Sequence, residues 1–105
     1  MSFRVLLTRE AEADLERLFD FVLERELGRD AGSPELAEQA IVAIRAGLAT
    51  LRTSPFTCRK AGQSPFLREL IIPFGRSGYV ALFEIVDPAD VVIAAVRHQL
   101  EDDYH

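Results

Sequence analysis

Apolar residues recur with a helical spacing in the first half of the chain and with a strand-like spacing in the second half. Phe3 to Leu7 is a short apolar run, as expected for a strand buried on at least one face. From Ala11 to Leu23 the apolar residues return every three or four positions, which predicts an amphipathic helix. Thr8 is placed to cap this helix through its hydroxyl, and Gly28 to end it in the left-handed conformation.

A second helix is predicted from about Pro34 to Arg52. Ser33 precedes it as a capping hydroxyl, and proline suits the first helical position. Its apolar stripe consists of Ala37, Ile41, Ile44, Leu48 and Leu51. Small residues, among them Gly47, flank this stripe and allow close approach of another helix. We therefore expect an antiparallel helical hairpin.

The C-terminal half holds three apolar runs that predict consecutive strands. They cover Leu67 to Ile72, Tyr79 to Val86 and Val91 to Val96, with Gly, Pro and Asp between them. The segment from Phe56 to Pro65 is predicted to be irregular, and Arg59 and Lys60 within it are either solvated or in contact with a phosphate or carboxylate. The expected fold is α+β: one strand, a two-helix hairpin and a three-stranded antiparallel meander, with the helices on one face of the sheet.

The run from Tyr79 to Val86 is apolar at both its odd and its even positions. A strand of this kind is expected in the centre of a sheet, covered on both faces. The helical hairpin can cover one face. A single domain of this size has no second layer for the other, so we expect an exposed apolar surface or a bound partner there.

Length and charge exclude several classes of function. With 105 residues the chain is expected to form a single domain, residues 1–105. Its net charge of -5 and its single lysine, Lys60, are unlike a general nucleic-acid binder. The one cysteine, Cys58, excludes an internal disulfide and has no partners at metal-ligand spacing. No signal peptide or membrane span is recognisable, so a soluble, cytoplasmic protein is expected.

Residues with potential chemistry gather near the C-terminus. The candidates are Arg68, Arg76, Arg97, His98 and Tyr104. Arginine for charge stabilisation, histidine for proton transfer and a tyrosine hydroxyl would suffice for metal-independent RNA cleavage. The alternative is structural, because neighbouring carboxylates can pair with these arginines and a histidine at a strand end is commonly a surface residue. The acidic run Glu101 to Asp103 would also repel a phosphate backbone near Tyr104.

Four stretches of the chain, taken in order, resemble the ParE/RelE superfamily of bacterial type II toxins. They read LLTREAEADLERLFDFV, LATLRTSP, LRELIIPFGRSGYVALFEIVD and VIAAVRHQLEDDYH. The ending Arg97-His98-Gln99 is most similar to the ParE-type branch, in which an Arg-His-Gln-Arg run is usual. This chain has Leu100 in place of the second arginine.

The resemblance implies a toxin that a cognate antitoxin holds inactive. That partner would be ParD-like, with a ribbon-helix-helix DNA-binding start and a tail that wraps the toxin. The antitoxin contacts we expect are Leu15, Phe19, Tyr79 and Phe83. The target contacts we expect are Arg97, His98, Gln99 and Tyr104. No metal and no cofactor is expected, nor any direct DNA binding without the antitoxin.

Two kinds of target are known for this superfamily, and a third interpretation assigns this chain no target. ParE-like members are described as DNA gyrase poisons, which makes catalysis by this chain itself unnecessary. RelE-like members are ribosome-dependent mRNA endoribonucleases. The scarcity of lysine, the negative charge and the acidic C-terminus favour growth inhibition through gyrase. The third interpretation is a degenerate toxin that retains only antitoxin binding.

Overall fold

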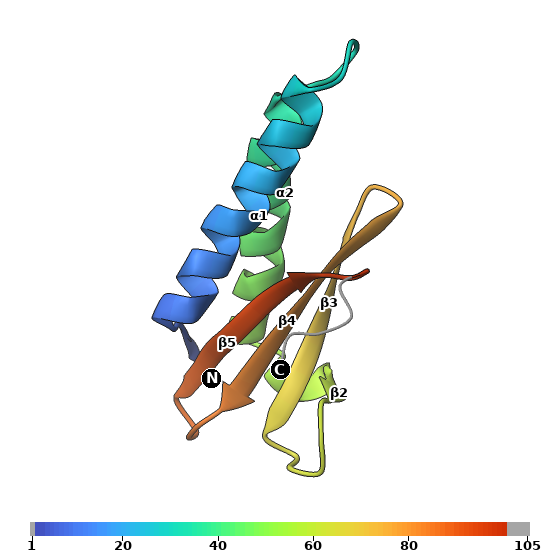
Figure 1. The fold of residues 1–105 in the computed structure, drawn as a ribbon. Helices are drawn as coiled ribbons and strands as arrows, with labels where there is room; N and C mark the ends of the chain where they lie inside the picture. Colours follow the sequence, from blue (N-terminus) through green and yellow to red (C-terminus); the bar gives the residue numbers. More distant parts are fainter. Residues whose placement is uncertain (1, 101–105) are drawn as a thin grey trace.

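The structure of the protein is a computed structural model, in which residues 2–100 are described. Its elements in chain order are β1 (Arg4–Leu7), α1 (Arg9–Leu27), α2 (Glu35–Ala49), two 3-10 turns (Thr50–Arg52 and Pro55–Thr57), β2 (Arg59–Lys60), β3 (Leu67–Phe74), β4 (Ser77–Ile85) and β5 (Asp90–His98). The two helices form an antiparallel hairpin over one sheet (Figure 1). The predicted α+β order is confirmed.

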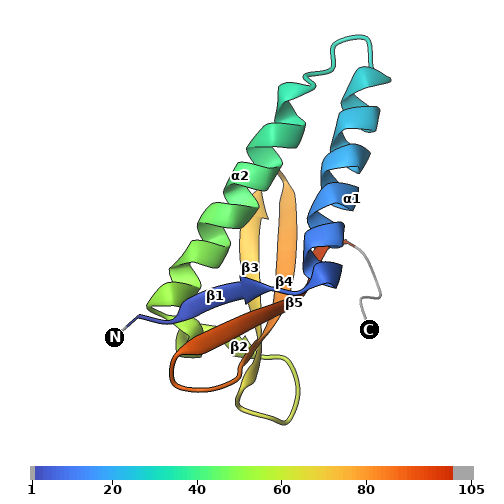
Figure 2. The same ribbon diagram turned by 90° about the vertical axis from the view of Figure 1, so that its left-hand side faces the viewer.

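The sheet has the strand order β1-β5-β4-β3-β2. β3, β4 and β5 form the predicted antiparallel meander, and β1 pairs with β5 in parallel, Arg4 aligning with Asp90 (Figure 2). The Arg4 Nε lies 2.9 Å from the Asp90 Oδ1. β2, which the sequence does not predict, adds two residues to the edge of β3. β4 is the central strand, as expected from its apolar pattern.

The helix ends differ in part from their predicted caps. The Thr8 hydroxyl accepts the Ala11 N–H at 3.0 Å, which confirms the first cap. Gly28 has φ -83°, so the expectation of a left-handed residue there was wrong. The Ser33 hydroxyl does not cap α2; instead the Ser33 N–H donates to the Glu26 Oε1 at 3.0 Å. The loop between the helices is therefore closed by a side chain of α1.

The core lies between the helical hairpin and the sheet. α1 packs against β5, and α2 packs against β3. Its fully buried large side chains include Ile44, Leu51, Phe83, Val91, Ile93 and Val96. A Cβ at Gly47 would lie 2.8 Å from the Ile72 Cγ1, so the absence of a side chain lets α2 approach β3 closely. The expected neighbour of these small residues was another helix; at Gly47 the close neighbour is instead β3 of the sheet.

The opposite face of the sheet is less completely covered. Along β4, Val80 is buried and Leu82 half-buried, whereas Glu84 is exposed. Ile71, which aligns with Val80, and Val86 are exposed as well. The expectation that a partner covers this face remains a prediction.

Candidate functional site

Arg97 is held at the edge of β5 by α1. β1 pairs with β5 only as far as Ile93, so the backbone beyond that point lacks a neighbouring strand on this side. The Asp14 Oδ2 accepts the Val96 N–H at 2.9 Å, and the Arg97 Nη1 pairs with the same carboxylate and donates to the Val96 carbonyl at 3.1 Å. Only 22% of the Arg97 side chain is exposed. Arg97 thus matches the structural alternative, in which a neighbouring carboxylate pairs with the arginine.

Arg68 is also bound within the chain. Its Nε donates to the Pro65 carbonyl at 2.7 Å, and its Nη1 donates to the carbonyls of Cys58 at 2.7 Å and Phe56 at 3.1 Å. The guanidinium carbon lies 5.4 Å from the centre of the Phe56 ring, a cation–π geometry. Arg68 therefore fastens the irregular segment before β3 to the sheet.

Two of the predicted nuclease residues, Arg68 and Arg97, do not share a face of the sheet. Arg68 aligns with Phe83 of β4, whereas Arg97 aligns with Val80. Aligned residues in neighbouring strands point to the same face, and positions three apart on one strand point to opposite faces. Phe83 and Val80 are also separated by about 10 Å along β4, at roughly 3.3 Å per residue. Arg68 and Arg97 are thus not brought together on one surface.

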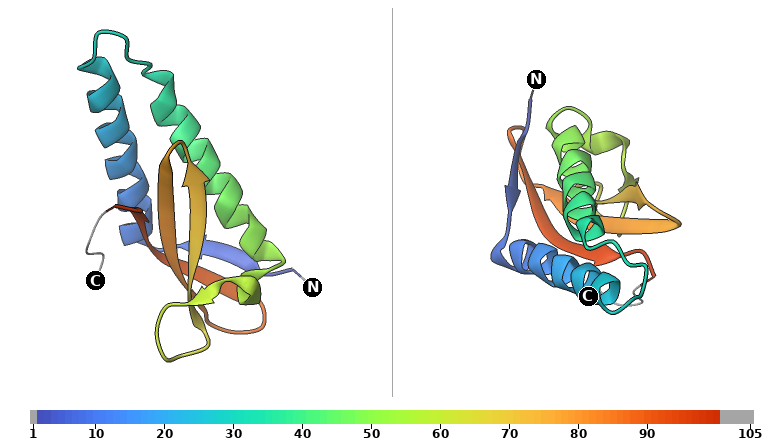
Figure 3. Two further views of the ribbon diagram at one scale, coloured as in Figure 1. Left: turned by 90° about the vertical axis from the view of Figure 1, so that its right-hand side faces the viewer. Right: turned by 90° about the horizontal axis from the view of Figure 1, so that it is seen from above.

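Two of the candidates, Arg76 and His98, do meet in a cavity that we call the hairpin cleft. It lies between the α1–α2 hairpin and the β3–β4 hairpin, which rise side by side in Figure 3 (left), and has a volume of about 600 Å³. The polar lining consists of Arg25, Arg29, Gln39, Arg76, Ser77 and His98. The apolar lining includes Leu18, Phe21, Val22, Leu36, Phe74 and Tyr79. No aspartate or glutamate lines the cleft among the described residues.

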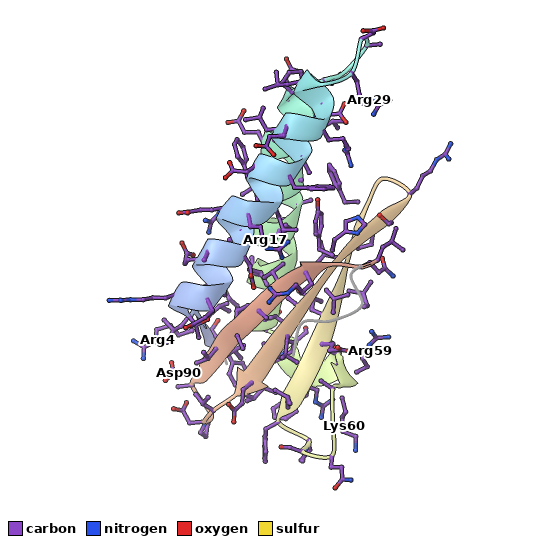
Figure 4. The ribbon with its side chains drawn as sticks, viewed as in Figure 1. Arg4, Arg17, Arg29, Arg59, Lys60 and Asp90 are labelled. Carbon is purple, nitrogen blue, oxygen red and sulfur yellow. The ribbon has the colours of Figure 1, made fainter. Side chains whose placement is uncertain are left out.

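A buried carboxylate positions the two arginines at the C-terminal end of α1, Arg25 within the helix and Arg29 just after it. The Glu26 Oε2 accepts from the Arg25 Nε at 2.9 Å and from the Arg29 Nη1 at 3.1 Å, while its Oε1 accepts the Ser33 N–H. Arg29 lies at the far end of the helical hairpin (Figure 4). The hydrogen bonds from Ser33 and Arg25 lower the pKa of Glu26. The carboxylate thus stays ionised and holds both guanidinium groups at the rim.

His98 is fixed in one tautomer on the β5 side of the cleft. The Leu100 N–H donates to its Nδ1 at 3.2 Å, so Nδ1 is an acceptor and Nε2 carries the proton of the neutral ring. Nε2 lies 3.0 Å from the Ser77 Oγ, to which it donates. The ring stands edge-on to Tyr79, with centroids 5.6 Å apart, and burial raises the pKa of the Tyr79 hydroxyl. These contacts fix the orientation of the ring at the cleft.

The residues expected to contact the antitoxin are buried to different extents. Phe19 is half-buried and, with Leu15, Ile41 and Arg45, lines a shallow groove of about 330 Å³ on the helical hairpin. Tyr79 is buried below the hairpin cleft. Phe83 is fully enclosed in the core, so its side chain has no surface to offer a partner. Phe19 and Tyr79 therefore mark two separate surfaces.

The remaining predicted residues add little to the site. Gln99 is exposed, and its N–H donates to the Gly78 carbonyl at 2.8 Å. Arg59 pairs with Glu69 at 2.9 Å, and neighbouring Lys60 is exposed (Figure 4). Tyr104 lies outside the described residues. Between residues 2 and 100 there is no group of three or more metal-ligating side chains and no helix able to cross a membrane.

Sequence reasoning missed Arg25, Glu26 and Arg29. Arg25 and Glu26 lie in the last turn of α1 and Arg29 follows its C-cap Gly28, and charged residues at a helix end ordinarily face solvent. Arg29 and Glu26 are three residues apart and form a salt bridge, but nothing in the sequence indicates a buried Glu26. The β3–β4 hairpin that faces them across the cleft comes much later in the chain.

Comparisons with known proteins agree with this architecture. A family model described as "ParE toxin of type II toxin-antitoxin system, parDE" matches residues 5–103. Toxin RelE1 of Caulobacter vibrioides is 32% identical over 101 residues, which cover 96% of this chain and 98% of that protein. Toxin RelE3 of the same organism is 34% identical over 97 residues, 92% of this chain and 95% of that protein.

The fold has a counterpart among solved structures. A chain of the chromosomal ParDE TA system from P. aeruginosa superposes with a TM-score of 0.70 at 21% identity, covering 92% of this chain and 96% of that one. At this identity the likeness concerns the fold. The family model and the two curated relatives span nearly the whole sequence. The chain belongs to the ParE toxin family of type II toxin-antitoxin systems, within the ParE/RelE superfamily.

Proposed function

We propose that this toxin arrests growth by poisoning DNA gyrase, and that it does so by binding the enzyme without itself catalysing a reaction. The observation that carries the proposal is the internal engagement of Arg68 and Arg97. Arg68 donates to three backbone carbonyls, and Arg97 pairs with Asp14 and the Val96 carbonyl. Neither guanidinium is in a position to stabilise a cleaved phosphate without breaking contacts that support the fold.

The charge of the molecule also favours a protein target. A ribonuclease must attract a phosphate backbone to its catalytic groups, whereas this chain has 17 acidic against 12 basic residues. Protein interfaces depend on local complementarity and apolar anchors, so a negative chain can still bind tightly. The hairpin cleft supplies both a cationic rim and an apolar floor.

The partner that neutralises the toxin is proposed to be a ParD-like antitoxin with a ribbon-helix-helix domain. Its amphipathic tail would lay an apolar face along the groove that contains Phe19 and Ile41. Val42, on the same helix as Ile41, is 66% exposed, so apolar surface continues beyond that groove. This arrangement would be consistent with a toxin that is normally covered by its partner.

The proposal is tested by expressing the toxin in bacteria without its antitoxin. DNA breaks and a DNA-damage response should accompany growth arrest, while messenger RNA remains intact. Co-expression of the protein encoded by the adjacent reading frame should restore growth. Phe19→Asp should weaken that rescue, and the exposed substitution Glu12→Gln on the same helix should not.

Either of two results would contradict the proposal and point to another function. Rapid, codon-dependent loss of messenger RNA with no DNA damage would make the toxin a ribonuclease of the RelE type. Normal growth at a protein level that saturates antitoxin binding would identify a degenerate toxin.

A further inference from the structure

We propose that the hairpin cleft is the surface that receives an acidic, amphipathic segment of the toxin's protein target. The inference rests on the proposed function in one respect, namely that the target is a protein. It assigns to His98 and Arg76 a shared role in recognition, and it adds Arg25 and Arg29, which the sequence did not suggest.

Charge segregation is the first argument. The chain is acidic as a whole, yet the described lining of the cleft contains three arginines and no carboxylate. Glu26, which pairs with Arg25 and Arg29, is 3% exposed, whereas the side chains of Arg25 and Arg29 are 45% and 62% exposed. The three arginines of the described lining therefore outnumber this enclosed carboxylate, and the lining carries a surplus of positive charge. A ligand with negative groups complements it.

The floor of the cleft supplies the second argument. Phe21 is 59% exposed at its edge, and the aliphatic side chains of Leu18, Val22 and Leu36 lie in the lining. Aliphatic side chains, together with the rings of Phe74 and Tyr79 in the same lining, bury the apolar face of a peptide. The volume of about 600 Å³ accommodates several side chains. The floor therefore suits the apolar face of an amphipathic protein segment.

Preorganisation is the third argument. Glu26 holds Arg25 of α1 and Arg29 just beyond it, and the hydrogen bonds of His98 to Ser77 and from Leu100 hold the ring on the opposite wall. Side chains that are already ordered lose less entropy when a ligand binds. Arg76 follows Gly75, whose φ of 62° forms the β3–β4 turn, and this turn presents the arginine at the exposed rim.

The experiment reverses charge at the rim. Arg76→Glu is the principal variant, because Arg76 is exposed at a turn, and Arg29→Glu is the second variant. The matched control is Arg52→Glu, because Arg52 is an exposed arginine that lies beyond α2. Thermal unfolding first establishes that each variant is folded. Inhibition of purified gyrase by the free toxin is then measured, and the two cleft variants should require about tenfold or more toxin for half-inhibition. Arg52→Glu should match the wild type.

A second measurement does not depend on gyrase. Two synthetic amphipathic peptides share the same leucine positions, and their polar positions are all glutamate in one and all lysine in the other. Calorimetry should detect binding of the glutamate peptide to the wild type and to Arg52→Glu, with loss of binding in Arg76→Glu. Binding of the lysine peptide or of duplex DNA in preference to the glutamate peptide would overturn the inference.

The two measurements separate this inference from the proposed function. If the wild type inhibits gyrase and Arg76→Glu inhibits it equally, the cleft assignment is wrong while gyrase remains the target. If the wild type leaves gyrase unaffected, the proposed target is wrong, and the peptide pair alone decides the chemistry of the cleft.

Discussion

The guanidinium of Arg97 and the carboxylate of Asp14 form an ion pair that joins β5 to α1 at the point where β1 stops covering the sheet edge. The same carboxylate accepts the Val96 N–H, so the Asp14 side chain both pairs with the Arg97 charge and provides a hydrogen-bond acceptor for the edge of β5. Residues of the Arg-His-Gln ending therefore divide into two roles. Arg97 supports the fold, and His98 faces the hairpin cleft.

Arg97→Ala is expected to destabilise the protein. The substitution leaves Asp14, whose side chain is 11% exposed, with a charge that has lost its closest partner. Loss of one partner in a buried polar contact costs about 1–3 kcal/mol. Urea denaturation of the wild type and the variant measures the difference.

Asp14→Asn tests the same ion pair from its other side. Arg9→Ala is the control, because Arg9 is exposed at the start of α1. In a double-mutant cycle Arg97→Ala and Asp14→Asn should be clearly non-additive. An Arg97→Ala variant as stable as Arg9→Ala, but without toxicity, would return Arg97 to the list of target contacts.

Arg68→Lys should loosen the segment before β3. Lysine cannot donate to three carbonyls in the geometry of the planar guanidinium, so at least one of Phe56, Cys58 and Pro65 would lose its bond. We expect a loss of stability of about 1–3 kcal/mol and faster amide exchange in residues 56–66, with toxicity per folded molecule unchanged. Full stability combined with lost RNA cleavage would contradict this assignment.

Glu26→Gln should change the dependence of stability on pH. Because the folded-state pKa of Glu26 is lowered, its ionisation stabilises the fold fully above the ordinary pKa of a carboxyl, and this contribution disappears as the pH falls through the lowered value. The variant lacks the charge at all pH values. The difference between wild type and variant should therefore shrink in acid, and Glu24→Gln, the same chemical change at an exposed position of α1, is the control variant.

Gly47→Ala is expected to destabilise the contact between α2 and β3. A methyl group there would meet Ile72 at 2.8 Å, and overpacking of this kind costs about 1–3 kcal/mol. Alanine gains about 1 kcal/mol in helix propensity, so the net effect should be a loss of about 1 kcal/mol. In Gly62→Ala the added atom approaches Leu67 to only 3.9 Å, and stability should be unchanged or slightly raised. Stabilisation by Gly47→Ala would show that Ile72 can move.

The elements of this fold are predictable where local periodicity and capping agree with tertiary packing. The apolar spacing of α1 and the two-sided pattern of β4 led to the correct element and position because both depend on burial of nearby residues. β2 escaped prediction because two residues carry no period and its pairing to β3 depends on Arg59 and Glu69. Gly28 was misjudged because its N–H reaches Glu24 and Glu26 carbonyls without a positive φ.

The site was less predictable than the fold because its walls come from distant segments. Arg76 and His98 were candidates by residue type alone, and their proximity follows from the antiparallel pairing of β4 and β5. From the sequence alone, Arg25 and Arg29 are expected to be solvated. The structure places the β3–β4 hairpin opposite them, across the cleft. Phe83 was expected to contact the antitoxin from a two-sided strand, yet its position in β4 places it on the side that the helices cover.

The most direct test of the gyrase assignment compares two purified systems with one preparation of toxin. The toxin is added to gyrase with relaxed plasmid, and in parallel to translating ribosomes with a defined messenger RNA. The account predicts loss of supercoiling with accumulation of cleaved DNA, and intact messenger RNA. Codon-specific RNA cleavage that disappears in His98→Ala or Tyr104→Phe, with supercoiling unaffected, would contradict it.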